Sequence, residues 1–305
     1  YLDITHKMAF NSDRSPQEAA LSSAQAVMLG VELPAIIFTN ILSLLTFKRM
    51  NELQLQHYLL MCLALSDLVM VIPLMVTIIG LVNEPLLQNV CLCKVIAITN
   101  HSVAALNTWI RCGVCVDKWL SIFKPVKHKQ FVSKHKPHHV AICYTLAAAF
   151  LVVGIIVTST LAGGIKAAPN KVLATCLYII DIPYILLIGT LFYLLPLITV
   201  LVTHLLILFE MRKSRFRKRT RIKKAMTALL FIVGIYYLCW LPYSVVVLWR
   251  ACFPQSAVPE TVEFVSMKLL IANTSMNFFV YLICFKGFRN ELKGLLRVQT
   301  RIQPQ

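Results

Sequence analysis

The chain has 305 residues, of which 58% are hydrophobic and only 14% are charged, and its mean hydropathy is +0.73. Soluble domains are about 45–50% apolar and about 25% charged, so this composition excludes an ordinary soluble domain and indicates a membrane protein. The formal net charge is +17, but the basic residues form short blocks between apolar runs. That pattern is typical of cytoplasmic loops and argues against nucleic acid as a partner.

Seven apolar runs are long enough to cross a hydrocarbon core, which takes about 20 residues. Each is expected to be helical, because backbone groups find no water to bind in the hydrocarbon. The stretch 286-KGFRNELKGLLRV-298 predicts a further, interfacial helix with Phe288, Leu292, Leu295 and Leu296 on one face. The expected fold is an all-α membrane protein, a seven-transmembrane helix bundle plus a short amphipathic helix. The expected spans are residues 23–47, 56–82, 92–123, 139–163, 182–209, 225–249 and 262–284.

Lysine and arginine predict the orientation of the bundle. Of the 30 basic residues, 22 lie in the connections after the odd-numbered spans and in the tail, whereas five lie on the opposite side. Because cytoplasmic loops carry the excess of Lys and Arg, the N-terminus is expected outside the cell. The expected organisation is an extracellular segment 1–22, the bundle 23–285, and the amphipathic helix with the cytoplasmic tail 286–305.

Polar residues recur along one stripe of the third span. Asn100, Asn107, Arg111 and Lys118 are separated by 7, 4 and 7 residues, and Ala104 lies between them. At about 100° per residue the four polar positions fall within roughly 40° of one another. Polar groups in hydrocarbon are costly, so the stripe is expected to face the bundle interior. Two interpretations stay open: a water-lined switching surface, or polar residues tolerated in a fully buried helix.

Other spans carry polar residues and prolines as well. Pro196 and Pro242 are expected to interrupt the fifth and sixth spans, because a proline inside a helix frees a backbone carbonyl and kinks the helix. Kinked helices around a polar interior form a bundle that can change shape. The polar residues of the other spans are Asn40, Asp67, Asn273, Asn277 and Tyr281.

These residues belong to a series of motifs. In chain order the series is Asn40, 63-LALSD-67, Cys93, 117-DKW-119 with Pro125, Pro196, 239-CWLP-242, 277-NFFVY-281 and 288-FR-289. The series resembles that of class A, rhodopsin-like, G-protein-coupled receptors over about residues 23–297. Each motif alone is weak, but the whole series in order on seven spans is highly specific.

The resemblance implies a plasma-membrane receptor that passes an extracellular ligand signal to a heterotrimeric G protein at the second and third inner loops. It also implies arrestin as a partner, and no cofactor, metal or enzymatic activity. The implied activation-switch residues are Asn40, Asp67, Asn107, Arg111, Asp117, Lys118, Trp119, Pro196, His204, Trp240, Pro242, Asn273, Asn277 and Tyr281.

Several positions depart from the family pattern. Lys118 stands where the family has an arginine, so the planar five-donor fork is lost. The stretch 221-RIKK-224 stands where the sixth span usually has an acid, His204 replaces a common tyrosine, and the fourth span lacks tryptophan. These departures favour, as the alternative, a weakly coupling or decoy receptor. A transporter or light-driven pump would need inverted repeats or broken helices, and the sequence indicates neither.

Two stretches resemble one branch of the family more closely. They are 108-TWI-110 and 271-IANTSMNFFVYLICFKGFR-289, the latter with Phe278 where most members have proline. Both are similar to the FMRFamide and myosuppressin receptors, which implies a peptide ligand.

Arg111 stands where the family has an apolar residue. In many members the counterparts of Asp67, Asn107 and Asn277 surround a sodium ion. Because Arg111 lies one turn inward of Asn107, it is expected to pair with Asp67 and replace the sodium. The alternative places Arg111 without a partner in a water pocket.

A second ion pair is expected from depth. Glu32 lies eight residues outward of Asn40, and Lys268 lies nine outward of Asn277, which is about 12 and 13.5 Å at about 1.5 Å per residue. Because the first and seventh helices are neighbours in the family's fold, the two charges are expected to pair beside the outer cavity. The alternative has Lys268 reaching outward and Glu32 at the lipid edge.

The outer half of the bundle is the expected ligand pocket. Asn100 stands where amine receptors have an acid, and Ile271 stands where visual pigments have the retinal-linking lysine, which argues against both ligands. A mixed-charge aromatic rim favours a peptide or another polar ligand. The expected ligand-binding residues are Asn100, His101, Ala104, Tyr243, Trp249, Arg250, Glu263, Glu32 and Lys268.

Four of the ten cysteines, Cys91, Cys93, Cys176 and Cys252, are expected outside the cell, where they allow three pairings. The family resemblance implies a disulfide between Cys93 and Cys176. Cys91 is the competitor, either paired with Cys252 or free.

Overall fold

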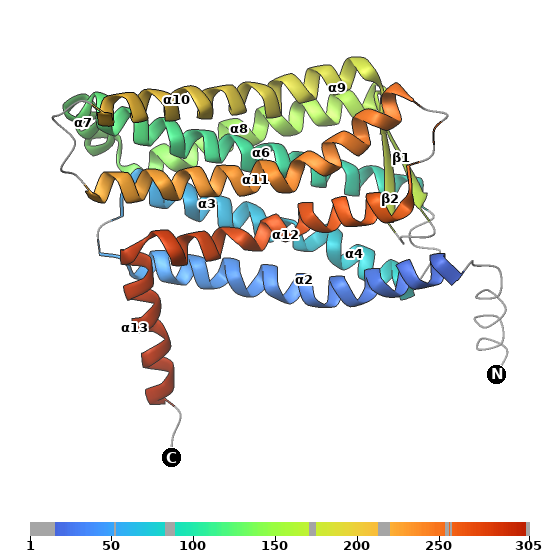
Figure 1. The fold of residues 1–305 in the computed structure, drawn as a ribbon, viewed down its shortest axis with the longest axis horizontal. Helices are drawn as coiled ribbons and strands as arrows, with labels where there is room; N and C mark the ends of the chain where they lie inside the picture. The colour runs from blue at the N-terminus through green and yellow to red at the C-terminus, as the bar shows by residue number, and fades with distance from the viewer. Residues whose placement is uncertain are drawn as a thin grey trace.

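Long helices run side by side in a single bundle (Figure 1). The structure is a computed structural model and describes residues 16–51, 53–82, 89–170, 175–212, 220–253, 256 and 258–302. Its helices are α2 Pro16–Arg49, α3 Leu55–Val69, α4 Val71–Val82, α6 Val90–Phe123, α7 Pro125–His135, α8 Pro137–Leu161, α9 Ile182–Gly189, the π-helical turn η2 Thr190–Leu194, α10 Leu195–Arg212, α11 Thr220–Cys252, α12 Glu260–Cys284 and α13 Lys286–Ile302.

The predicted spans coincide with α2, α3 with α4, α6, α8, α9 to α10, α11 and α12. By length and composition, five spans within the described residues are long and apolar enough to cross a membrane. α12 meets the same test together with α13, although the chain bends by 98° between them. The all-α seven-helix bundle and its amphipathic end helix are therefore confirmed. The five spans are Ser23–Arg49, Leu55–Ile79, Val90–Phe123, Pro137–Leu161 and Ile182–Glu210.

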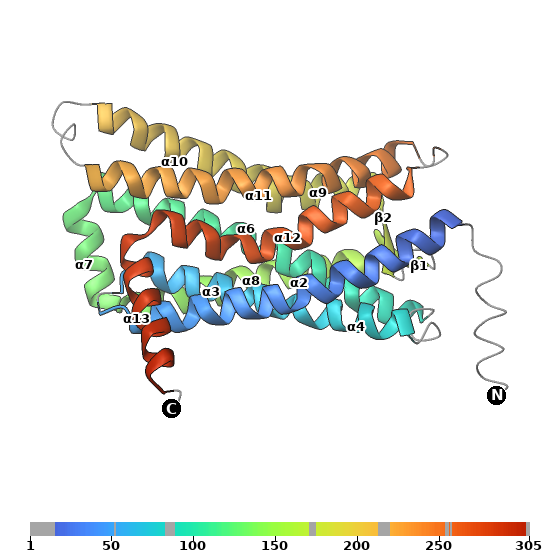
Figure 2. The same ribbon diagram turned by 60° about the horizontal axis from the view of Figure 1, so that its bottom comes forward.

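α6 lies at the centre of the bundle, against α3, α8 and α10, while α12 packs between α11 and α2 (Figures 1 and 2). The contact of α12 with α2 is the neighbour relation that the predicted Glu32–Lys268 pair requires. α6 and α8 approach closely at Gly113, where an added Cβ atom would lie 2.7 Å from the ring of Tyr144. The hydroxyl of Tyr144 donates to the Trp109 carbonyl at 2.6 Å and holds the two helices together.

Prolines shape three of the spans in different ways. The second span breaks after Val69, because Pro73 offers no N–H to that carbonyl and its ring crowds it; this break was not predicted. In the fifth span the π-helical turn η2 ends just before Pro196, and such turns often mark functional sites. α11 continues through Pro242 as one helix (Figure 1), so the predicted interruption of the sixth span there is wrong.

Two elements outside the spans were not predicted. Strands β1 Ile165–Asn170 and β2 Thr175–Ile180 form an antiparallel hairpin in which Ile165 pairs with Ile180. The hairpin lies at the end of the bundle opposite α7 (Figure 1). α7 is a separate short helix, set off by an N1 proline and by Lys136, whose φ is 58°. The apolar-run criterion missed both elements because neither is long and apolar.

α13 packs through its apolar face on the end of the bundle that the sequence predicts to be the inner one. Phe288 is fully buried. Its ring packs against the rings of Phe47 and Tyr281, with centroids 5.1 and 5.7 Å away. Leu292 is also buried, whereas Leu296 is exposed. The predicted face therefore divides into a buried part, which packs on α2 and α12, and an exposed part at Leu296.

Candidate functional site

A cavity lies between α2, α4, α6, α11 and α12, in the half of the bundle that the sequence predicts to be the outer one. Four of the expected ligand-binding residues line it: Asn100, His101, Ala104 and Tyr243. Residues that the sequence analysis did not assign to the pocket line it as well. They include Gln25, Thr77, Asn107, Tyr236, Trp240, Met267, Leu270, Asn273 and Thr274.

Five residues expected in the pocket do not line this cavity. Trp249 is 47% exposed, and its indole N–H donates to Ser256 Oγ at 2.8 Å. The other four residues are charged and form two ion pairs between helices. The sequence predicted the pairing of Glu32 with Lys268, but it placed Arg250 and Glu263 at the rim of the pocket and missed that they pair with each other. These four are Arg250, Glu263, Glu32 and Lys268.

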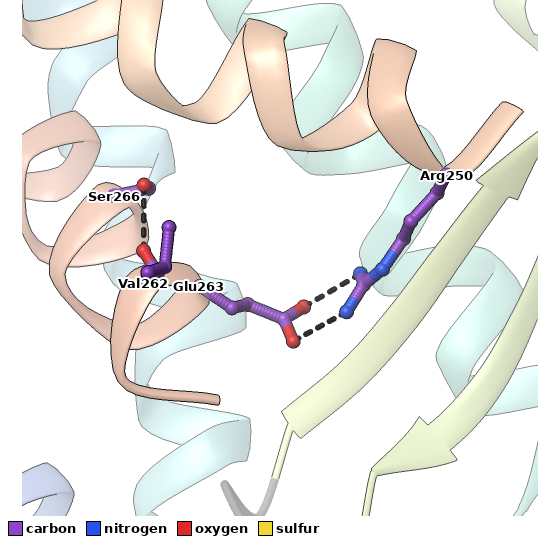
Figure 3. Close-up of polar contacts among 4 residues, drawn as sticks. All are labelled: Arg250, Val262, Glu263 and Ser266. Atoms are coloured by element: carbon purple, nitrogen blue, oxygen red, sulfur yellow. Dashed lines mark hydrogen bonds and ion pairs between the residues drawn. The ribbon is translucent and has the colours of Figure 1, made fainter. Parts of the chain in front are cut away.

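Arg250 of α11 and Glu263 of α12 form a two-pronged ion pair (Figure 3). Nη1 donates to Oε1 at 2.8 Å and Nη2 donates to Oε2 at 2.6 Å. Within α12, the hydroxyl of Ser266 donates to the Val262 carbonyl at 2.7 Å. The planar fork of arginine matches a carboxylate, so the pair ties α11 to α12 and leaves neither charge for a ligand.

Lys268 and Glu32 form the ion pair that their depths predict. Lys268 Nζ donates to Glu32 Oε2 at 2.9 Å, and the two side chains are only 6% and 10% exposed. The ammonium also lies 5.6 Å from the centroid of the Phe264 ring. The alternative placement, with Lys268 reaching outward, is therefore wrong, and the pair ties α12 to α2.

Beneath the cavity, Asp67 is the centre of a buried polar cluster. Its side chain is fully buried. Oδ1 accepts from Asn107 Nδ2 at 2.7 Å, and Oδ2 accepts from Asn277 Nδ2 at 2.8 Å. The carboxylate thus joins α3 to α6 and α12. Asn40 extends the cluster to α2, where its amide donates to the Thr274 carbonyl at 3.2 Å.

Arg111 does not form the predicted ion pair with Asp67 within the described part of the chain. Its Cζ lies 4.3 Å from the centroid of the Tyr236 ring, and Nη2 reaches Asn277 Oδ1 at 3.5 Å. Asn277 therefore stands between the two charges, with its amide N–H₂ on Asp67 and its amide oxygen toward Arg111. The prediction failed because it placed Arg111 by helical angle alone, whereas the aromatic face of α11 offers a closer partner.

Arg111 nevertheless lies inside the bundle, as the polar stripe predicted. It is 3% exposed, and Asn107 is 6% exposed. Nε and Nη1 of Arg111 have no hydrogen-bond partner among the described residues. The stripe therefore faces the interior of the bundle, and the Nε and Nη1 groups of Arg111 on it can still donate hydrogen bonds.

Aromatic rings connect the cavity to this cluster. Tyr236, Trp240 and Tyr243 stand on one face of α11, and Trp240 lies 4.8 Å, between ring centroids, from Tyr193. The hydroxyl of Tyr236 shares a hydrogen bond with Thr108 of α6. A ligand that displaces these rings would act directly on the contact between α6 and α11.

The inner end holds the remaining switch residues. Asp117 Oδ1 bonds His128 Nε2 of α7 at 2.7 Å, and Lys118 follows Asp117 in the same helix. Trp119 lies 5.5 Å from the Phe123 ring. His204 and Tyr281 are buried. Asp117 is thus held by the second inner loop, a contact that the sequence analysis missed because α7 was not predicted.

Cys93 is disulfide-bonded, whereas Cys91 and Cys252 carry free thiols. Cys176 lies in β2, opposite Pro169, and its side chain lies outside the described residues. We expect non-reducing peptide mapping to recover Cys93 linked to Cys176, because Cys176 is the remaining outer cysteine. Reduction before digestion is the control, and a Cys91–Cys176 peptide would contradict the assignment.

The geometry of seven helices, an outer cavity and a buried polar cluster agrees with a comparison to known families. Residues 39–281 match the family model of the 7 transmembrane receptor (rhodopsin family). The chain belongs to this family of class A receptors. It is therefore a multi-pass membrane protein of a receptor family rather than of an enzyme family.

Curated relatives match only part of the chain. A mouse C3a anaphylatoxin chemotactic receptor is 32% identical over 112 residues, which is 34% of this chain and 23% of the relative. A mouse alpha-1A adrenergic receptor is 34% identical over 28% of this chain and 18% of its own length. The human D(4) dopamine receptor is 33% identical over 28% of this chain and 21% of its own length. The chain thus matches about a fifth of each relative's length, and the names of these receptors differ too much to indicate a ligand.

Proposed function

We propose that this receptor lies in the plasma membrane, N-terminus outside, and passes the binding of an extracellular ligand to a heterotrimeric G protein. Arrestin is the second inner partner that the family implies. One observation carries the proposal: Asn107 lines the cavity floor and also donates to Asp67, which holds Asn277 of α12. A ligand contact at Asn107 is therefore two hydrogen bonds away from α12, the helix that carries Tyr281.

The proposed inner surface includes α7, Lys118 and the basic stretch 212-RKSRFRKRTRIKK-224, most of which lies outside the described residues. The resemblance to the FMRFamide and myosuppressin branch supports a peptide as the ligand. Few polar groups line the cavity and none of those described carries a full charge, so we expect only a short segment of such a peptide to enter it.

A decoy receptor is the second candidate, and Lys118 favours it. Lysine keeps the positive charge but lacks the planar fork of arginine. The test is nucleotide exchange on purified G proteins of each class, measured with the receptor in lipid nanodiscs and with empty nanodiscs as the baseline. Exchange above that baseline supports signalling, and exchange at the baseline for every class supports the decoy.

The Lys118→Arg variant is expected to raise the maximal rate of nucleotide exchange by about 10-fold, because each charge-assisted hydrogen bond that the fork restores is worth about 1.5 kcal/mol. The measurement compares initial exchange rates at equal receptor concentration. Lys124→Arg at the end of α6 is the matched control and should leave the rate unchanged. An unchanged rate for Lys118→Arg would show that the lysine does not limit coupling.

The His128→Leu variant is expected to raise ligand-independent exchange. It removes the contact that holds Asp117 to α7, so the inner end of α6 is released. His138→Leu on α8 is the control, since the ring of His138 packs against Tyr58 at a centroid distance of 5.8 Å. If both variants behave alike, the effect belongs to the basic surface and not to the Asp117 contact.

A further inference from the structure

We propose that the part of the ligand that enters the cavity is uncharged and places a neutral hydrogen-bond donor, an amide N–H or a hydroxyl, against Asn107. The inference rests on the proposed function, because it takes the cavity as the ligand site.

The cavity wall carries no full charge. Asparagine, glutamine, threonine, aromatic and aliphatic side chains line it, and no Lys, Arg, Asp or Glu is among the described residues of its wall. His101 is already bonded to the Ala97 carbonyl through Nδ1 at 2.8 Å. A charged group that left water for this site would lose its hydration and gain no counter-charge, which is strongly unfavourable.

The four charged residues that the sequence placed in the pocket are paired with one another. Glu263 holds Arg250 through two hydrogen bonds, and Glu32 holds Lys268 between α2 and α12. Breaking either pair to bind a ligand charge would strand the other partner in a mostly buried position. A charged ligand would therefore form one ion pair only by breaking another.

Asn107, at the cavity floor, carries a buried amide oxygen that can accept a further hydrogen bond. Asp67 accepts from Asn107 Nδ2 at 2.7 Å, and a carboxylate can only accept from the nitrogen end of the amide. This fixes the orientation of the amide, so Oδ1 faces away from Asp67. Oδ1 is buried and has no partner among the described residues, and a buried acceptor without a partner is costly. A ligand donor that moves the atoms covering Oδ1 would satisfy it.

The donor is expected to be neutral rather than cationic. Asp67 and Arg111 lie together behind the floor, joined through Asn277, so their opposite charges largely offset each other at the cavity. The wall above is the aromatic face of Tyr236, Trp240 and Tyr243. The cavity thus fits an apolar or aromatic body with a neutral donor at its inner end.

Charge selectivity can be measured without knowing the ligand. Ala104→Cys places a thiol on the cavity wall, in a chain that also carries Cys91→Ser and keeps the exposed Cys252 as a reference outside the cavity. Three methanethiosulfonates of similar size, with hydroxyethyl, trimethylammonioethyl and sulfonatoethyl groups, are reacted with the receptor in nanodiscs. Mass spectrometry gives the rate at each cysteine.

For each reagent, the rate at position 104 is divided by the rate at Cys252. This ratio is expected to be at least about 10-fold higher for the neutral reagent than for either ion, because an unpaired charge is disfavoured in the cavity. Adding Asn100→Asp, one turn away on α6, is the positive control and should make the cationic reagent the fastest. An ionic reagent that matches the neutral one in the parent background would overturn the assignment of an uncharged ligand.

The donor is tested with two isomers, benzyl alcohol, which has an O–H, and anisole, which has none. Benzyl alcohol is expected to slow labelling at position 104 at lower concentrations than anisole, and Asn107→Leu should remove the difference. Equal effects of the two isomers, including no effect, would overturn the donor assignment. Labelling needs no G protein, so a receptor that selects the neutral reagent but fails in nucleotide exchange refutes the proposed function alone.

Discussion

The purified receptor is expected to show the same melting temperature in sodium chloride and in choline chloride at equal ionic strength. Both carboxylate oxygens of Asp67 already accept from amide groups, at 2.7 and 2.8 Å. The guanidinium of Arg111 lies next to Asn277 in the same cluster. A sodium ion about 4 Å from that guanidinium would be repelled by about 4 kcal/mol at an effective dielectric of about 20.

The Arg111→Leu variant is expected to lose stability and to gain sodium dependence. Without the guanidinium, the Asp67 carboxylate is a buried charge with no compensating cation nearby, which costs about 3–5 kcal/mol in comparable buried pairs. Sodium can then supply the missing positive charge and restore the arrangement common in the family. Sodium should therefore raise the melting temperature of the variant and not that of the parent.

Two further variants control this experiment. Arg111→Lys keeps a positive charge and should stay insensitive to sodium. Asp67→Asn removes the carboxylate, strands Arg111 without a compensating charge and should lower the yield of folded receptor. A clear sodium-dependent shift in the parent would show that Arg111 does not replace the ion and that Asp67 retains a sodium site.

A large and non-additive effect is expected at the ion pair between α2 and α12. Lys268→Met alone should destabilise the receptor by about 3–5 kcal/mol, because it leaves Glu32 buried without its counter-charge. The double variant Glu32→Leu with Lys268→Met should recover most of this loss, since an apolar pair of similar volume needs no desolvation of charge. Thermal or denaturant unfolding of all four members of the cycle gives the coupling free energy.

The pair between Arg250 and Glu263 is the matched comparison. Arg250→Met would strand Glu263, whose side chain is 5% exposed against 10% for Glu32. It also removes two hydrogen bonds instead of one, so it should cost at least as much as Lys268→Met. A clearly smaller cost for Arg250→Met, or additive losses in the Glu32–Lys268 cycle, would show that the stranded carboxylate does not govern these losses.

Periodicity and charge in the sequence predicted the fold because each is set by a local physical rule. An apolar run of the right length must be a helix in hydrocarbon. The spacing of Asn100, Asn107 and Arg111 puts them on one face whatever their neighbours are. Depth along a straight helix likewise predicted that Glu32 and Lys268 would meet, because a rise of about 1.5 Å per residue is nearly constant.

The same rules say little about which neighbour a long side chain selects. Arg111 lies at the predicted depth and on the predicted face, but it stacks on Tyr236 rather than pairing with Asp67. Arg250 and Glu263 lie near the predicted rim, but they turn toward each other and not into the cavity. The break after Val69 followed from Pro73, a local signal that was present in the sequence and was missed.

By itself, the sequence determined that this protein is a seven-helix membrane bundle with a polar interior, and it determined the depth of each polar residue. Only the tertiary structure decided that Arg250 pairs with Glu263, that α7 holds Asp117, and that uncharged groups line the cavity. The physical reason is that depth and face follow from the regular geometry of a single helix, whereas the choice of partner depends on the rotation and spacing of two or three helices at once.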